Sequence, residues 1–462
     1  ASNAVIPYES SSGGDPGSDP TQEPEPTPEP TPEPTPAPEP STADETGVEI
    51  LVNGKPETAA TATTTKVEDK TVTTIMVDDK KVEERLEREE NKALVTIPVD
   101  NDTDVVIGLL NGQTVKNMEN KEAVLEIKTT NVIYTIPASQ INIDNVSEQI
   151  GEHVELNDIT VSVKISEPAA DTVEIIKDTA DKNNYQIIVK PIEFEITCSN
   201  GDKTVEVSRF SAYVERLIAI PEGIDPYKIT TGVVLNADGT FSHVPTVIIV
   251  IDGKYYAKIN SLTNSTYLLI YSPKAFKDVE KHWAENEVND MASRLVMIGM
   301  DDDKFKPEDD ITRAEFAAIV VRALGLMRSG AGKDTFMDVM KKDLHYDAVS
   351  IAYEYGIILG YGNGKFGLDD KITREQAITM IARAMKVAGL KVELADGEAD
   401  MLLTSFTDTN SVAEYAKTDI ASCVKAGIVF GRSGKLIAPK DNITRAEAAA
   451  IVQRLLRSSK LI

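Results

Sequence analysis

Apolar and polar positions follow two different periods along the 462-residue chain. Between residues 45 and 272, many short runs alternate apolar with polar side chains, as half-buried β-strands do. Between residues 276 and 462, apolar residues recur every three or four positions, as on the buried face of an amphipathic helix. The pattern therefore predicts a β-rich part followed by a helical part.

The β-rich part is expected to form one large or two small antiparallel modules, with a β-sandwich as the expected arrangement. Its turn signals are Asn53-Gly54, Asp238-Gly239 and Asp252-Gly253, which favour tight hairpins. One helix is expected near Lys81–Glu90. The expected strands are Val48–Val52, Thr71–Val77, Val105–Leu109, Ala123–Ile127, Val132–Ile136, Thr160–Ile165, Val173–Ile176, Gln186–Val189, Phe194–Thr197, Thr204–Val207, Thr246–Ile251 and Tyr255–Ile259.

In the helical part, one short sequence occurs three times, as Ile311–Glu315, Ile372–Gln376 and Ile443–Glu447. Each copy places Thr three residues before Glu or Gln, which is the capping-box pattern of a helix start. Apolar residues at helical spacing follow each copy, so each is expected to begin an amphipathic helix.

The residue after each threonine is arginine: Arg313, Arg374 or Arg445. A cation at the first helical position is disfavoured by the helix dipole, by about 0.3–1 kcal/mol. Three such arginines indicate that an anionic group binds between the side chain and the helix start. The alternative left open is that they pair with acids between repeats.

The copies belong to repeats, because Arg374 follows Arg313 by 61 residues and precedes Arg445 by 71. Each repeat opens with Phe-x-Asp, continues with an aromatic residue, and has a glycine 14 residues before its arginine. This constancy is a strong internal signal. The acids are Asp278, Asp338 and Asp408; the aromatics are Trp283, Tyr346 and Tyr415; the glycines are Gly299, Gly360 and Gly431.

These repeats resemble S-layer homology repeats. The resemblance rests on Phe276–Val279 with Trp283, on Phe305–Pro307, on the threonine–arginine sequence, and on Gly360–Phe366 in the second copy. It implies an all-α domain with pseudo-three-fold symmetry. It also implies that grooves between repeats bind the secondary cell-wall polysaccharide of Gram-positive bacteria, often a pyruvylated amino sugar. Such binding anchors secreted proteins noncovalently to the cell surface.

Some positions depart from the family pattern. The second repeat has Tyr346 near the usual tryptophan position, and the third has Tyr415. The third also reads Asp408-Thr409 and has Leu436 where the other loops have phenylalanine. The resemblance therefore leaves open whether the three grooves are equal.

The polar candidates allow two interpretations each. The arginines suit a sugar carboxylate, because a guanidinium binds it through two parallel hydrogen bonds. The three aspartates are expected to cap the following helix or to orient sugar hydroxyls. The three aromatics stack on a sugar or fill the core, and the three glycines allow a left-handed turn or a close backbone approach.

Charge is distributed unevenly within the net charge of -27. Residues 1–275 contain 22 Lys and Arg against 46 Asp and Glu, whereas residues 276–462 contain 26 against 29. Nucleic acid is thus an unexpected partner for the first part. No apolar run reaches the length of a membrane span, which is about 20 residues.

Residues 1–44 are expected to be a tag scar, Ala1–Ala4, followed by a disordered Pro-rich linker with a Pro-Thr-Pro-Glu repeat. Such a linker suggests that an upstream module is missing. The other expected divisions are a β-rich surface module at 45–275 and repeats at 276–335, 336–405 and 406–462.

No metal site or cofactor is expected. The histidines His153, His243, His282 and His345 lack ligand spacing, and the acidic run Asp301–Asp303 lacks the glycine and glutamate of a calcium loop. Cys198 and Cys423 are expected to be buried free thiols. A carboxylate pair for glycoside hydrolysis has no supporting motif.

The leading hypothesis is a noncatalytic cell-wall anchor on the cell surface. Several weak sites on one polymer would give strong attachment. The alternative is a structural S-layer lattice protein whose β module makes self-assembly contacts. A polysaccharide-active enzyme is the third and least supported interpretation.

Overall fold

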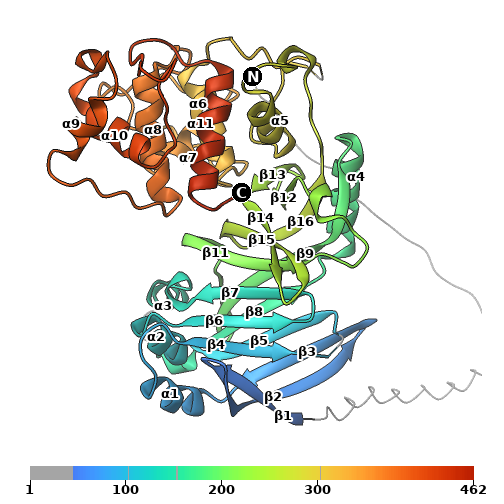
Figure 1. Ribbon diagram of the computed structural model, residues 1–462. Coiled ribbons are helices and arrows are strands. Elements are labelled where there is room, and N and C mark those ends of the chain that lie inside the picture. Colours follow the sequence, from blue (N-terminus) through green and yellow to red (C-terminus); the bar gives the residue numbers. More distant parts are fainter. Residues whose placement is uncertain (1–44, 102, 152–153, 302) are drawn as a thin grey trace, which may run out of the picture. The chain divides into compact units, whose positions relative to one another are not determined.

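In the computed structural model, the structure describes residues 45–101, 103–151, 154–301 and 303–462 (Figure 1). The predicted tag scar and linker at 1–44 lie outside these ranges, as do His153 and Asp302.

The described strands join into one 16-stranded sheet in which most neighbours are antiparallel. The exceptions are β3 with β5 and β4 with β6, which pair in parallel. The strands are β1 Glu45–Val52, β2 Lys55–Val67, β3 Lys70–Val77, β4 Leu94–Val99, β5 Val105–Asn111, β6 Val124–Thr129, β7 Val132–Pro137, β8 Thr160–Ser166, β9 Gln186–Asn200, β10 Lys203–Glu206, β11 Arg209–Ala219, β12 Thr231–Leu235, β13 Phe241–Val244, β14 Thr246–Ile251, β15 Lys254–Thr263 and β16 Thr266–Tyr271.

The sheet runs in the order β13-β12-β16-β9-β8-β5-β3-β2-β1-β4-β6-β7-β11-β15-β14, with β10 beside β9. The three predicted hairpin turns are confirmed, because Asn53-Gly54 joins β1 to β2, Asp238-Gly239 lies between β12 and β13, and Asp252-Gly253 joins β14 to β15. Within the described residues, all strands of the β-rich part belong to this one sheet.

Three helices, α1 Asp79–Glu87, α2 Gly112–Asn120 and α3 Ile143–Ile150, lie together on one side of this sheet (Figure 1). Their buried Val82, Met118 and Val146 contribute to the same core as the strands. Burial of these apolar faces is what holds the helices in place, at about 25 cal/mol per Å² of apolar surface removed from water.

Two strand predictions need correction. Val173–Ile176 belongs to a helix, α4 Ala170–Lys182, whose Ile176 packs with Val233 of β12 and Leu268 of β16. The separate strands expected at 186–189 and 194–197 are parts of the single strand β9.

The remaining helices all follow β16. They are α5 Glu285–Ser293, α6 Arg313–Ala323, α7 Tyr346–Glu354, α8 Arg374–Val387, α9 Glu398–Leu403, α10 Lys417–Lys425 and α11 Arg445–Ser458. Short 3-10 helices occur at Ala138–Gln140, Leu156–Asp158, Pro226–Lys228, Lys277–Val279, Thr409–Ser411 and Glu414–Ala416. The helices share one hydrophobic core, to which Phe316, Ile378 and Ile451 of the three central helices contribute.

The first repeat contacts the β-rich part directly. The hydroxyl of Tyr213 in β11 donates to the carbonyl of Leu324, which ends α6, over 2.7 Å. At Gly325 the backbone has a φ of +65°, and a side chain there would meet Pro245 at 2.6 Å. Glycine is therefore required at this contact by both its conformation and its lack of a side chain.

Candidate functional site

The three predicted helix starts are confirmed. α6, α8 and α11 begin at Arg313, Arg374 and Arg445, and each has a complete capping box. In each, the threonine hydroxyl accepts from the N–H three residues later, and that residue's carboxylate or amide accepts from the threonine N–H. The caps satisfy N–H groups that a helix start otherwise leaves free.

Backbone hydrogen bonds join the three helix starts in a closed ring. The N–H of Ile372 donates to Ile311 at 3.1 Å, and the N–H of Ile443 donates to Ile372 at 3.1 Å. The N–H of Ile311 closes the ring by donating to Ile443 at 3.3 Å. Each repeat is therefore fixed against both others at the residue just before its capping threonine.

Each arginine side chain crosses into the loop of the following repeat, and that of the third repeat returns to the first. The donor is Nε and the acceptor is a loop carbonyl in every case. The bonds run from Arg313 to Phe366 (2.9 Å), from Arg374 to Ile437 (2.8 Å) and from Arg445 to Phe305 (2.8 Å). These bonds give the arginines a role in joining the repeats.

The aspartates of the Phe-x-Asp sequences bind the same loops, but through the backbone N–H groups and not the carbonyls. Asp278 accepts from the N–H groups of Phe305 and Lys306, at 2.9 and 2.7 Å. Asp338 and Asp408 each accept from the two corresponding N–H groups of their own loops. The expectation that these aspartates cap the following helix is wrong, because α5, α7 and α10 have no side-chain cap.

The arginines differ in their further partners. Arg374 donates from Nη1 to Glu447 at 2.7 Å, whereas Arg313 lies over the ring of Tyr361, 4.5 Å from its centre. Arg445 lies 4.4 Å over the ring of Phe305. All three are buried, with 3–6% of their surface exposed. Burial lowers the pKa of each guanidinium, because desolvation disfavours the charged form.

A cavity of about 660 Å³ lies in the third repeat, beside Arg374 of the second repeat. Trp283 of the first repeat borders it, and 58% of the Trp283 side chain is exposed. The lining residues are Trp283, Glu308, Arg374, Phe430, Gly431, Arg432, Ser433, Thr444, Glu447, Ala450, Ile451 and Arg454. We call this cavity the third-repeat groove.

The groove has a cationic wall. Glu447 accepts from Arg374 at 2.7 Å and from Arg432 at 2.8 and 3.0 Å, so two arginines neutralise one carboxylate. Arg454 lies 4.8 Å over the ring of Phe430 and has no ion pair among the described residues. An anion entering the groove would meet Arg454 and the exposed edge of Arg432.

The structure corrects the alignment of the aromatic positions. Trp283 and Tyr415 each stand just before the residue that caps the next helix, and both are more than half exposed. In the second repeat this place belongs to Leu344, which is 90% exposed. Tyr346 is instead the first residue of α7, is buried, and donates its hydroxyl to Asp334.

The structure shows both of the expected reasons for the three glycines, a left-handed backbone and a close approach of other atoms. Gly360 has a φ of +72°, in the left-handed region. At Gly299 and Gly431 the reason is close approach, because a side chain would meet the rings of Phe276 and Phe406 at 2.4 and 2.8 Å. In the described part of the chain, Gly299 lines a cavity in the first repeat and Gly431 lines one in the third.

One loop position was misaligned. Ile437, and not Leu436, occupies the place of Phe305 and Phe366: it is fully buried, receives the Arg374 hydrogen bond and donates to Asp408. Leu436 is 42% exposed. The sequence also marks Ile437, because it stands eight residues before Arg445, as Phe305 and Phe366 stand before Arg313 and Arg374.

The remaining candidate residues are the cysteines and the histidines. Cys198 and Cys423 are buried free thiols, as predicted. Within the described residues, no cluster of His, Cys, Asp and Glu has the geometry to hold a metal ion. His282 contacts Glu308 at 2.6 Å, and His243 is buried against Thr231.

The sequence interpretation missed Arg432, Arg454 and Glu308 as groove residues. Arg454 follows Arg445 by nine residues, and the same spacing places Arg322 after Arg313 and Arg383 after Arg374. This spacing was a readable signal. Arg432 had none, since Met300 and Tyr361 take its place in the other repeats.

Residues 275–317, 336–378 and 405–449 each match the S-layer homology domain family. The chain carries three S-layer homology domains. In the part of the chain that the structure describes, none of the helices is long and apolar enough to cross a membrane.

This chain is similar to parts of three longer proteins. An amylopullulanase of Thermoanaerobacterium thermosulfurigenes is 28% identical over 73% of this chain and 18% of its own length. Exoglucanase XynX of Acetivibrio thermocellus is 35% identical over 40% of this chain and 16% of its own length. The cellulosome-anchoring protein of Acetivibrio thermocellus is 33% identical over 34% of each protein.

The chain thus spans between 16% and 34% of the length of these relatives. The amylopullulanase match exceeds the length of the helical part, so the likeness extends into the β-rich part. The S-layer homology domains of this chain, together with its likeness to a cellulosome-anchoring protein, support attachment to the cell surface.

Proposed function

We propose that the three S-layer homology domains hold the protein noncovalently to a wall polysaccharide by binding an acidic sugar, such as a pyruvylated amino sugar, in the third-repeat groove. The observation that carries the proposal is a guanidinium that makes no ion pair among the described residues and lines the same cavity as an exposed indole. Arg454 supplies the cation, and Trp283 supplies an apolar face for a sugar ring.

The surfaces beside Arg313 and Arg445 are proposed as further binding sites of the same kind. Tyr415 as well as Tyr361 lies near Arg313. The three aspartates hold the loops through hydrogen bonds from backbone N–H groups. Two or more such sites on one polymer would give a long-lived attachment from weak individual contacts.

We also propose that a pseudo-three-fold axis relates the repeats, with domain divisions at 275, 335 and 405. The ring of isoleucine hydrogen bonds and the cyclic arginine bonds support this arrangement. The protein would then be secreted and held at the surface of a Gram-positive cell, with no catalytic role of its own.

The experiment is a sedimentation assay with cell walls before and after acid extraction of the polymer. Binding should be lost after extraction, and Arg454→Ala should weaken binding at least tenfold. Arg88→Ala, at an exposed position of the β-rich part, is the matched control. Equal sedimentation of the two variants would contradict the assignment of the groove.

The alternative, a surface-lattice protein, is favoured by one observation. Strand β14 ends the sheet, and Val250 and Ile251 on it are 56% and 37% exposed. An apolar edge strand can pair with another copy. Ordered sheets of the purified protein in electron micrographs would support the lattice, whereas dispersed monomers that bind walls would support the anchor.

A further inference from the structure

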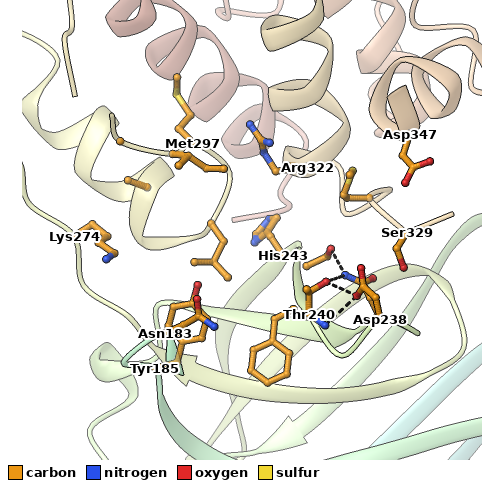
Figure 2. Close-up of a pocket in the computed structure, with 18 of the residues that line it drawn as sticks. Asn183, Tyr185, Asp238, Thr240, His243, Lys274, Met297, Arg322, Ser329 and Asp347 are labelled. Atoms are coloured by element: carbon orange, nitrogen blue, oxygen red, sulfur yellow. Dashed lines mark hydrogen bonds between the residues drawn. The ribbon is translucent and has the colours of Figure 1, made fainter. Parts of the chain in front are cut away.

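A second cavity, of about 730 Å³, lies where the β12–β13 hairpin meets the first repeat (Figure 2). The hairpin contributes Asp238, Thr240 and Phe241, and the repeat contributes Gly299 and Arg322. We call this cavity the junction pocket. It is larger than the third-repeat groove and is distinct from it.

The junction pocket uses the same repeat positions as the groove. Ile298, Gly299, Asp301 and Arg322 in the first repeat correspond to Phe430, Gly431, Ser433 and Arg454 in the third, because each stands at an equal distance from its box arginine. In the first repeat, residues of the β-rich part therefore add a wall to the same surface that forms the groove in the third repeat.

Two cations line the pocket, Lys274 and Arg322, and neither makes an ion pair among the described residues. Arg322 donates from Nε to the carbonyl of Val296 at 2.8 Å, and it makes no ion pair among the described residues. Burial and the nearby Arg445 lower the pKa of its guanidinium to about 10. An anionic group beside Arg322 would relieve both causes.

The acids of the pocket are already engaged. Asp347 accepts from the N–H groups of Gly330 and Gly332, at 3.0 and 2.7 Å, and Asp238 accepts from the N–H and the hydroxyl of Thr240. Asp301, the third acid of the lining, accepts from the N–H groups of Asp303 and Lys304 at 3.0 and 2.8 Å. None of the three acids forms an ion pair with Arg322. Their remaining lone pairs can accept from sugar hydroxyls.

The rest of the lining suits a sugar body. Tyr185 and Phe241 stack with 6.2 Å between ring centres and are only partly buried, so an apolar face stays available. His243 is 1% exposed, accepts or donates at Nδ1 with Thr231, and has no partner at Nε2 among the described residues. Asn183, Asn236 and Ser329 add neutral hydrogen-bonding groups.

We propose that the junction pocket binds a carboxylate-bearing saccharide unit of the wall polymer, with the carboxylate on Arg322 and the sugar ring against Tyr185 and Phe241. This rests on the proposed function, because it places a second segment of the same polymer at the junction. The β-rich part thereby takes part in wall binding.

The test uses two reporters that separate the sites. Met297 and Met327 line the junction pocket, and no methionine lines the third-repeat groove. Trp283, which lines the groove, is the only tryptophan in the sequence. Methionine-methyl NMR therefore reports on the pocket, and tryptophan fluorescence reports on the groove.

The full chain is titrated with sodium D-glucuronate, with D-glucose, and with acid-released fragments of the wall polymer. Glucuronate and the fragments should shift the methyl signals of Met297 and Met327, and glucose should not. Ser329→Phe, which fills the pocket, and Arg322→Gln should weaken these shifts at least tenfold, with partial rescue in Arg322→Lys. Trp283 fluorescence should still respond to the fragments in Ser329→Phe.

Unmoved methionine signals, or equal shifts with glucose, would overturn the proposal. Shifts with glucuronate but not with the fragments would overturn its link to the wall polymer. Failure of the proposed function is a separate result: the wild-type chain would not sediment with walls, and Trp283 would not respond to the fragments.

Discussion

Arg374 and Glu447 connect the second and third repeats through a contact of 2.7 Å between Nη1 and Oε1. Glu447 is also the capping-box residue of α11 and the acceptor for Arg432. One carboxylate thus caps a helix, joins two repeats and forms one side of the third-repeat groove.

Glu447→Gln should destabilise the protein by about 3 kcal/mol, at the lower end of the cost of breaking a buried ion pair. Glutamine can still form the capping box, as Gln376 does in α8, so the loss isolates the charge. Urea unfolding measures it. Glu414→Gln, which removes an exposed pair with Lys417, is the control and should change stability little.

Lowering the pH should remove the stabilisation that the charge of Glu447 provides. Burial alone would raise the pKa of Glu447, but hydrogen bonding from Arg432 and the charge of Arg374 bring it below its ordinary value of 4.5. The stabilisation is therefore complete above pH 4.5 and is lost as the pH falls through the lowered folded-state value. Unfolding free energies of the wild type and Glu447→Gln should converge below that pH, and a constant difference down to pH 2 would contradict the assignment.

Gly299→Ala should destabilise the first repeat by about 1–3 kcal/mol, the usual cost of overpacking. The added methyl would lie 2.4 Å from the ring of Phe276 and 2.7 Å from the carbonyl of Asp301. Thermal unfolding measures the effect. Gly47→Ala is the control, because its nearest neighbour is 3.9 Å away.

Arg216→Met should destabilise the β-rich part by about 3 kcal/mol, because hydrogen-bond acceptors would be left buried without a donor. Arg216 is fully buried, lies 4.8 Å over the rings of both Tyr134 and Tyr267, and donates to Asn264 at 2.7 Å. Calorimetry should show the loss.

Arg209→Met, at an exposed position, is the control for Arg216→Met. Arg216 has no acid partner among the described residues. Its positive charge is therefore stabilised by the aromatic rings and by neutral hydrogen-bond acceptors. A stability equal to that of the wild type would mean that the rings and acceptors repack around methionine at no cost.

The helical part could be predicted well from the sequence because its signals are local. A threonine, an arginine and a glutamate or glutamine within four residues define each helix start, and the cap forms within the same turn. Two aligned positions were wrong although their spacing marks them. Leu344 stands 30 residues before Arg374, as Trp283 stands before Arg313, and Ile437 stands eight residues before Arg445, as Phe305 stands before Arg313.

The sheet could be predicted only in part, because its pairings join distant segments. β3 pairs in parallel with β5, and no local turn indicates that contact. Val173–Ile176 is apolar enough for a strand or a helix over four residues, and its burial against β12 and β16 decided for the helix.

The arginine bonds leave no open end among the three repeats: each loop is completed by the guanidinium of its predecessor, and the last returns to the first. A copy gained by gene duplication would have no vacant acceptor, and a copy lost would strand one buried cation. Three is therefore the number at which this assembly closes, so we expect evolution to exchange the repeats as a set.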